Sequence, residues 1–153
     1  MALIRLNAQS APANTFGGGK VLQIVSTDKT DTFSTTSTSF VDVTGLSVQI
    51  TPSSTSSKIL VTGALVCSAT NHWIYARLMR DSTQVLTPAG TLGNRTTANF
   101  GFGESDASNY MPATLPIHAL DSPSSTSQLT YKIQIEVHLG TGYVNLTGRD
   151  GNH

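Results

Sequence analysis

The residues from Leu129 to Leu139 alternate strictly between apolar and polar side chains. A period of two over eleven residues predicts a β-strand with one face in a core and one in water, because successive side chains of a strand point to opposite faces. A helix would spread the same apolar side chains around its whole axis. A strand with one buried face and one solvent-exposed face is typical of an antiparallel sheet, and its apolar face needs a second layer to cover it.

Serine and threonine are unusually abundant, with 18 Ser and 22 Thr among 153 residues. Threonine favours strands and serine favours turns, and no helical pattern of useful length interrupts them. The length fits one domain. We therefore expect an all-β fold over residues 20–153, an antiparallel two-sheet β-sandwich of jelly-roll-like form, with an extended N-terminal arm.

Turn-forming residues divide the domain into short strands, with Thr44–Gly45 expected as the turn between the second and the third. Pro112 and Pro116 indicate an edge strand. Lys58–Ala69 is apolar on both parities, which predicts a strand covered on both faces or a central strand at a subunit contact. The expected strands are Val21–Val25, Phe40–Val43, Leu46–Ile50, Lys58–Ala69, Trp73–Arg80, Gln84–Leu86, Thr96–Gly103, Ala113–Ala119, Leu129–Leu139 and Tyr143–Thr147.

Residues 1–19 are expected to form the arm. An apolar stretch, Met1–Leu6, is followed by a polar segment that ends in a flexible joint, Gly17–Gly19. Burying the apolar side chains against their own domain would require ordering that joint, which costs backbone entropy. We therefore expect the arm to dock on a neighbouring subunit or another protein through Leu3, Ile4, Arg5, Leu6 and Phe16.

Charge and cysteine content narrow the classes of partner. Nine basic residues balance nine acidic ones without any Lys/Arg cluster, so nucleic acid is not an expected partner. No apolar window is long enough for a membrane helix or a signal-peptide core. The single cysteine, Cys67, excludes an internal disulfide and is expected to be a small buried hydrophobe. These features predict a soluble domain made in a reducing compartment.

The sequence offers little catalytic chemistry. It has no Gly-x-Ser-x-Gly motif and no nucleotide-binding glycine motif. Glu104 and Asp106 could hold calcium, but solvated loop charges are the commoner outcome. Trp73, Tyr75 and Tyr110 could form a sugar-stacking platform, although core or interface packing is the more frequent fate of such rings. We expect no enzyme, no cofactor and no metal.

Nine short segments between residues 19 and 147 form a recognisable pattern: Gly19–Gln23, Thr30–Ser34, Phe40–Val48, Ile50–Ser54, Ser57–Val61, Leu78–Ser82, Leu120–Pro123, Tyr131–Lys132 and Gly142–Asn145. With these segments the chain resembles a family of small β-sandwich proteins encoded among the virion genes of tailed bacteriophages. Met1–Asn7 is also similar to the openings of such proteins.

The resemblance implies a virion structural protein that is made in the cytoplasm of a bacterial host. Two functions are compatible with it. The first is a capsid cement, or decoration, protein, a homotrimer on the capsid surface that binds the major capsid protein. The second is a tail-fibre or adhesin module that binds host glycans. Family members continue past the segment matching Gly142–Asn145 into a further apolar strand, so we expect a sheet that is one strand short or is closed by a strand from elsewhere.

Overall fold

The computed structural model describes residues 21–70, 72–87, 97–104 and 112–146. Over these residues the chain is all-β, with two antiparallel sheets packed as a sandwich and no helix, as the sequence predicted. The strands are β1 (Phe33–Thr35), β2 (Val41–Ile50), β3 (Ile59–Ala69), β4 (His72–Arg80), β5 (Thr83–Gln84), β6 (Phe100–Glu104), β7 (Ala113–Asp121), β8 (Leu129–Val137) and β9 (Gly142–Val144).

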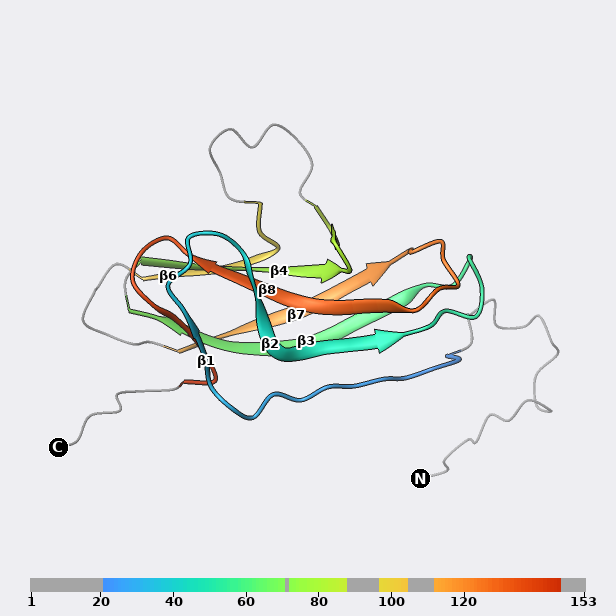
Figure 1. Ribbon diagram of the computed structural model, residues 1–153, viewed down its shortest axis with the longest axis horizontal. Helices are drawn as coiled ribbons and strands as arrows, with labels where there is room; N and C mark the ends of the chain where they lie inside the picture. Colours follow the sequence, from blue (N-terminus) through green and yellow to red (C-terminus); the bar gives the residue numbers. More distant parts are fainter. Residues whose placement is uncertain (1–20, 71, 88–96, 105–111, 147–153) are drawn as a thin grey trace, which may run out of the picture.

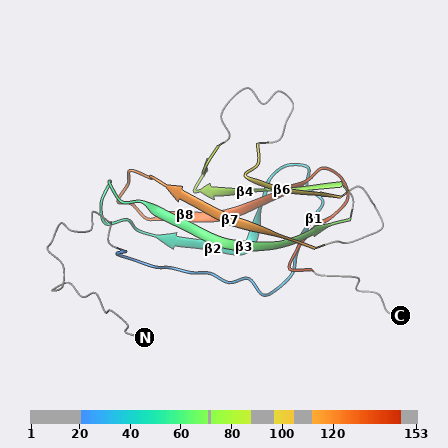
Figure 2. The same ribbon diagram turned by 180° about the vertical axis from the view of Figure 1, so that it is seen from behind.

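The two sheets interleave along the chain. Sheet A has the order β1-β9-β3-β7, and sheet B has the order β2-β8-β4-β5, with β6 also paired to β4 (Figure 1). Apart from the β4–β5 hairpin and the β4–β6 pair, each ladder in these sheets joins strands that lie far apart in the sequence. β7 pairs only with β3 and forms an edge of sheet A, which confirms the position indicated by Pro116 (Figure 2).

The strand β8 lies at the centre of sheet B, between β2 and β4. Its odd-numbered side chains are buried and its even-numbered ones are partly exposed, so the predicted alternation is confirmed. Ile135 and Val137 are almost completely buried, as are Ile74 of β4 and Val144 of β9. The core therefore lies between the sheets, with β8 supplying its longest apolar row. The strand ends at Val137, two residues earlier than predicted.

Two sequence predictions in the first third of the chain are wrong. Val21–Val25 is not a strand in this structure; it is extended coil with exposed side chains. Thr44–Gly45 does not separate two strands, because β2 runs through it as one strand with a bulge. There, five residue steps of β2 (Asp42 to Ser47) match only two steps of β8, and Gly45 takes up a left-handed conformation with φ 82°.

The remaining differences concern short strands. Phe33–Thr35 forms β1, which the hydroxyl-rich sequence around it did not reveal. β9 covers only Gly142–Val144, because Asn145 adopts φ 58° and turns the chain out of the ladder. Because β9 is short, much of β3 has no neighbouring strand on one side among the described residues, and this determines where the candidate site lies.

Candidate functional site

Several residues singled out in the sequence lie outside the described part of the chain. These are the expected arm contacts Leu3, Ile4, Arg5, Leu6 and Phe16, together with Tyr110 and Asp106. Within the described residues, no group of three or more His, Cys, Asp or Glu side chains could hold a metal ion. No helix in that part of the chain is long and apolar enough to cross a membrane. Cys67 is buried, as predicted, and burial raises its pKa to about 11, so its thiol is unreactive at neutral pH.

One edge of β3 is paired along only part of its length. The carbonyl of Val66 accepts a hydrogen bond from the Asn145 amide (3.0 Å), and the Thr70 amide donates to Thr141 (2.9 Å). Even-numbered residues of β3 therefore direct their backbone groups towards β9, because the direction alternates along a strand. The β9 ladder covers only Cys67–Ala69.

The other half of this edge meets no strand of the described structure. Leu60, Thr62 and Ala64 direct their N–H and C=O groups to the same side as Val66, beyond the end of β9. No described residue forms a backbone hydrogen bond to these groups on that side. We call the region where β3 and the outer edge of β2 face each other the open side of the sandwich. The opposite side, where β6 lies against β7, is the closed side.

The open side leaves part of the core incompletely covered. Inward-facing residues of β2 and β3 are only half-buried there, whereas their counterparts on β7 are buried. A groove of about 490 Å³ also opens on this side, between Leu46 of β2, Ala64 and Leu65 of β3, and the segment at Thr27–Thr30. We call the half-buried apolar row the seam; it consists of Leu46, Val48, Ile50, Ile59 and Val61.

The segment Val21–Thr30 runs along the open side, below β2 and β3 in Figure 1. It is anchored at its end, where the Asn145 side chain donates to the Lys29 carbonyl (2.6 Å). The Lys29 ammonium group is itself buried and lies 2.9 Å from Asp31, and this hydrogen bond lowers the pKa of the Asp31 carboxyl. Towards its start the segment is exposed, with Val21, Leu22 and Ile24 at 74%, 64% and 84% of full exposure.

The outer face of sheet A carries no charged side chain on β3 or β7. Leu60 and Leu120 are directly paired across the strands and are 60% and 59% exposed. The pairs that follow along the ladder are Thr62 with His118, Ala64 with Pro116, and Val66 with Thr114. This face therefore combines two large exposed apolar side chains with a histidine, two threonines and smaller apolar neighbours, and we call it the uncharged face.

The outer face of sheet B is charged and hydrogen-bonded. Asp42 accepts from Lys132 (2.8 Å) and from Gln134 (2.6 Å), and Gln134 accepts from Arg77 (2.8 Å). The Arg77 guanidinium also lies 4.0 Å above the Phe40 ring. The hydrogen bonds from Lys132 and Gln134 lower the pKa of Asp42. These charges are satisfied within the face, which suits exposure to water.

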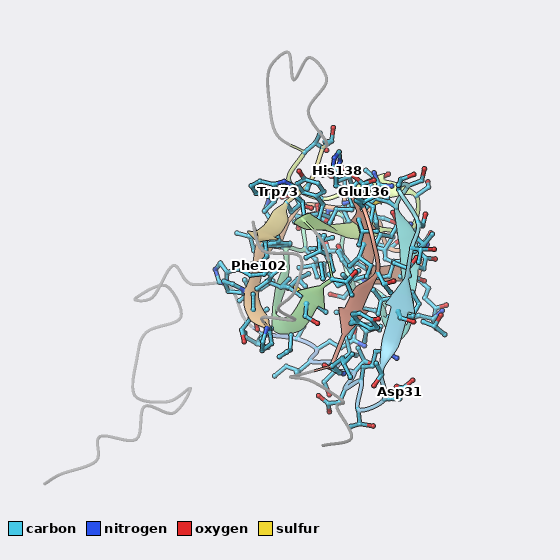
Figure 3. The ribbon with its side chains drawn as sticks, turned by 90° about the vertical axis from the view of Figure 1, so that its left-hand side faces the viewer. Asp31, Trp73, Phe102, Glu136 and His138 are labelled. Carbon is cyan, nitrogen blue, oxygen red and sulfur yellow. The ribbon has the colours of Figure 1, made fainter. Side chains whose placement is uncertain are left out.

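An aromatic surface occupies one end of sheet B. The rings of Trp73 and Tyr75 are within 8° of parallel, with centroids 6.4 Å apart, and Trp73 is 49% exposed. Each ring lies across a glycine of β6, because a Cβ on Gly103 would fall 2.0 Å from Trp73 and one on Gly101 would fall 3.2 Å from Tyr75. Figure 3 places Trp73 close to Glu136 and His138.

The strand β4 therefore presents two of the three rings that the sequence suggested as a platform, and it presents them to solvent rather than to the core. Glu136 comes from β8, where it is paired with Tyr75. Exposed Trp and Tyr rings of this kind combine an apolar surface with a polar atom at the edge, which is typical of interfaces.

The sequence indicated some of these surfaces and missed others. The apolar residues on both parities of Lys58–Ala69 were the signal for the uncharged face, since Leu60 and Ala64 fall on the outward parity. In the described structure β9 pairs with β3 only over Cys67–Ala69. The position of the seam had no sequence signal, because it depends on how few residues of β9 join the sheet.

Comparison with known proteins adds no assignment: no family model and no curated protein matches the chain.

Proposed function

We propose that the protein is a structural protein of a tailed-bacteriophage virion, and more specifically a homotrimeric capsid cement protein. The uncharged face of sheet A sits on the major capsid protein, and the charged face of sheet B points to solvent. The protein is made in the host cytoplasm and functions on the capsid surface. The family resemblance of the sequence supports the virion assignment.

The contrast between the two outer faces carries the proposal. Burying a charged side chain without a partner is costly, whereas burying Leu60 and Leu120 is favourable. A protein that is wet on one face and covered on the other gains from having its charges on the first face only. The arrangement of the strands provides this separation, because β3 and β7 contribute an uncharged outward row and β8 contributes Lys132 and Glu136.

Binding to purified shells tests this proposal. Leu60→Glu adds one charge to the uncharged face, and Gln49→Glu adds the same charge to an exposed position of β2 on the other face. Losing the burial of one leucine corresponds to about 1.5–3 kcal/mol, so Leu60→Glu should weaken co-sedimentation with shells at least about tenfold. Gln49→Glu should bind like wild type. Equal binding by both variants contradicts the proposed face.

Copy number separates the cement function from a tail location. In purified virions, the band of a cement protein should be comparable in molar amount with the band of the major capsid protein. A band corresponding to a small fraction of that amount would place the protein on the tail instead.

A second function, a tail-fibre or adhesin module that binds host glycans, is favoured by the exposed pair Trp73 and Tyr75 beside Glu136. Aromatic stacking contributes about 0.5–1.5 kcal/mol beyond burial of the ring's area. Under this function Trp73→Ala should weaken adsorption of the protein to host cells by about tenfold, while Phe40→Ala, a ring elsewhere on sheet B, should leave adsorption intact. Adsorption that is absent in wild type, or unchanged in Trp73→Ala, contradicts this second function.

A further inference from the structure

We infer that the open edge of β3 is completed by the segment Val21–Val25 from a second copy of this chain. The edge uses backbone groups of Leu60, Thr62 and Ala64, whereas the uncharged face uses the side chains of the same residues. The inference concerns the backbone groups and does not depend on shell binding. It rests on two features that each lack a partner among the described residues of the chain: an unpaired strand edge and an unpaired segment with the sequence of a strand.

The segment has the composition of a β-strand but is not paired with any described strand. Val21–Thr27 contains seven residues, three of them β-branched aliphatics, and none is charged. No backbone hydrogen bond joins Val21–Thr27 to any other described residue. Its apolar side chains are nevertheless largely exposed, with Ile24 at 84%. A sequence that favours a strand but leaves its backbone and side chains in water indicates a partner outside the single chain.

The edge of β3 lacks the features that normally prevent strand addition. Exposed edges are usually protected by charges, prolines or bulges. β7 has Pro116 at its edge, and β2 has both Asp42 and the bulge at Gly45. Residues Ile59–Val66 of β3 have no charge, no proline and no bulge in the ladder with β7. This unguarded length of eight residues is long enough to pair with all five residues of Val21–Val25, since both strands advance by about 3.3 Å per residue.

The side chains of the segment also complement the seam. In a strand, Leu22 and Ile24 share one face, while Val21, Gln23 and Val25 share the other. The first row has the larger side chains and no polar member, so it enters the seam against Val48 and Val61. Those two seam residues are only half-buried in the single chain and gain cover from the added strand.

Chain direction disfavours the segment of the same copy. β1 is antiparallel to β9, and β9 is antiparallel to β3, so β1 runs in the same direction as β3. The segment leads towards β1 along that direction (Figure 1). Adding it to its own β3 would create a parallel ladder in a sandwich whose described ladders are all antiparallel. A second copy can supply the segment in the antiparallel direction.

Cross-linking between two differently tagged variants tests the inference. One full-length chain carries Gln23→Cys and the other carries Thr62→Cys, both in a Cys67→Ala background. The two chains are co-expressed and purified, and the complex is treated with a short flexible cross-linker that carries two thiol-reactive maleimide groups. The length of the cross-linker tolerates a shift in the register of the added strand. A product that contains both tags can form only between chains, and we expect it to be the main product. Its size, and that of the uncross-linked protein by light scattering, gives the number of copies.

A matched pair of variants provides the second measurement. The double variant Gln23→Pro/Ile24→Pro removes two consecutive backbone donors, one of which must point towards β3 because the direction alternates along a strand, so it should lower the self-association constant by about tenfold or more relative to Gln23→Ala/Ile24→Ala. The alanine pair keeps both donors, so the difference between the two variants measures the contribution of the backbone ladder. Both should unfold like wild type when monomeric, because the segment has no backbone hydrogen bonds in the single chain.

Three results would overturn the inference. The first is a wild-type protein that is monomeric at micromolar concentration, and the second is the absence of the mixed-tag product. The third is a chain carrying both Gln23→Cys and Thr62→Cys in which the cross-link forms only within one chain. A monomer that still sediments with shells would refute strand exchange and leave the cement function standing. An oligomer that assembles through the segment but does not bind shells would support strand exchange and refute the cement function.

Discussion

The closed side and the open side of the sandwich both direct aliphatic side chains into the core, but these side chains are buried to different extents. On the closed side, β7 buries Leu115, Ile117 and Ala119 against the core. On the open side, Leu46 and Val48 of β2 occupy equivalent inward positions but remain half-buried. The difference lies in the neighbours rather than in hydrophobicity. On the closed side β7 has a buried inward row, although Phe100 and Phe102 of β6 are only partly buried, and on the open side the described pairing of β3 ends with β9.

The closed side is also tied together by a polar cluster between the sheets. Asp121 of β7 accepts from Arg80 of β4 (2.5 Å) and from Tyr131 of β8 (2.6 Å). Burial alone would raise the pKa of Asp121, but these two hydrogen bonds outweigh burial and lower it. Burial, together with the hydrogen bond to Asp121, raises the pKa of Tyr131, so the phenol stays protonated. The open side has no such tie among the described residues of β2 and β3.

A pair of leucine truncations should give the largest difference between the sides. Leu115→Ala on the closed side removes a buried side chain and should cost about 2–5 kcal/mol of unfolding free energy. Leu46→Ala on the open side removes a half-buried one and should cost about 1–2 kcal/mol in the monomer. Urea unfolding of both variants checks this. Equal costs would mean that the open side is as well covered as the closed side.

A pair of aspartate truncations sharpens the comparison. Asp121→Ala leaves Arg80 without its partner in a mostly buried site, so it should cost about 3 kcal/mol, the low end for such pairs. Asp42→Ala breaks the ion pair with Lys132, in which Asp42 is half-exposed, and should cost about 0–1 kcal/mol. Thermal unfolding of the two variants at neutral pH measures the difference. A larger loss for Asp42→Ala would contradict the structural role given to the cluster.

Acid should weaken the closed side through the same group. The pKa of Asp121 is lower in the folded chain than the ordinary value near 3.8, so the unfolded state binds more protons in acid. Its contribution is complete above about pH 5 and is lost as the pH falls through the folded pKa. The melting temperature should therefore fall below about pH 4. Asp121→Asn should show a shallower fall, and an identical pH profile would refute this assignment.

The smallest effect on the single chain should come from the segment. Ile24→Ser replaces an exposed side chain that has no described partner, so the free energy of unfolding of the monomer should change by less than about 0.5 kcal/mol. Self-association should weaken in the same variant. A destabilised monomer would show that the segment packs on its own domain.

The sequence predicted the fold well for strands that have one face in the core and the other face exposed to solvent. The alternation in Leu129–Leu139 identified a strand and its buried row, because the period-two pattern is carried by the segment itself. Its central position and its pairing with β2 and β4 come from the structure. The edge position of Pro116 was also predicted, since proline cannot donate to a ladder on both sides.

The sequence was less informative wherever a strand depends on partners. Val21–Val25 has the composition of a strand but no ladder to join in the single chain, so local propensity and the structure disagree. Conversely, Phe33–Thr35 becomes β1 only because β9 lies beside it. The open edge of β3 could be predicted only in part from the sequence. An open edge is a strand edge without a pairing partner, and pairing depends on residues that lie far apart in the chain.

Hydrogen exchange at the amides of β3 tests the central claim most directly. In the monomer, Val61, Gly63 and Leu65 donate towards β7, whereas Leu60, Thr62 and Ala64 face the open side. We predict alternating protection in the monomer, with the even-numbered amides exchanging fast, and uniform protection of all six in the assembled protein. Uniform protection in the monomer, or even-numbered amides that stay unprotected after assembly, would contradict the claim that a partner completes this edge.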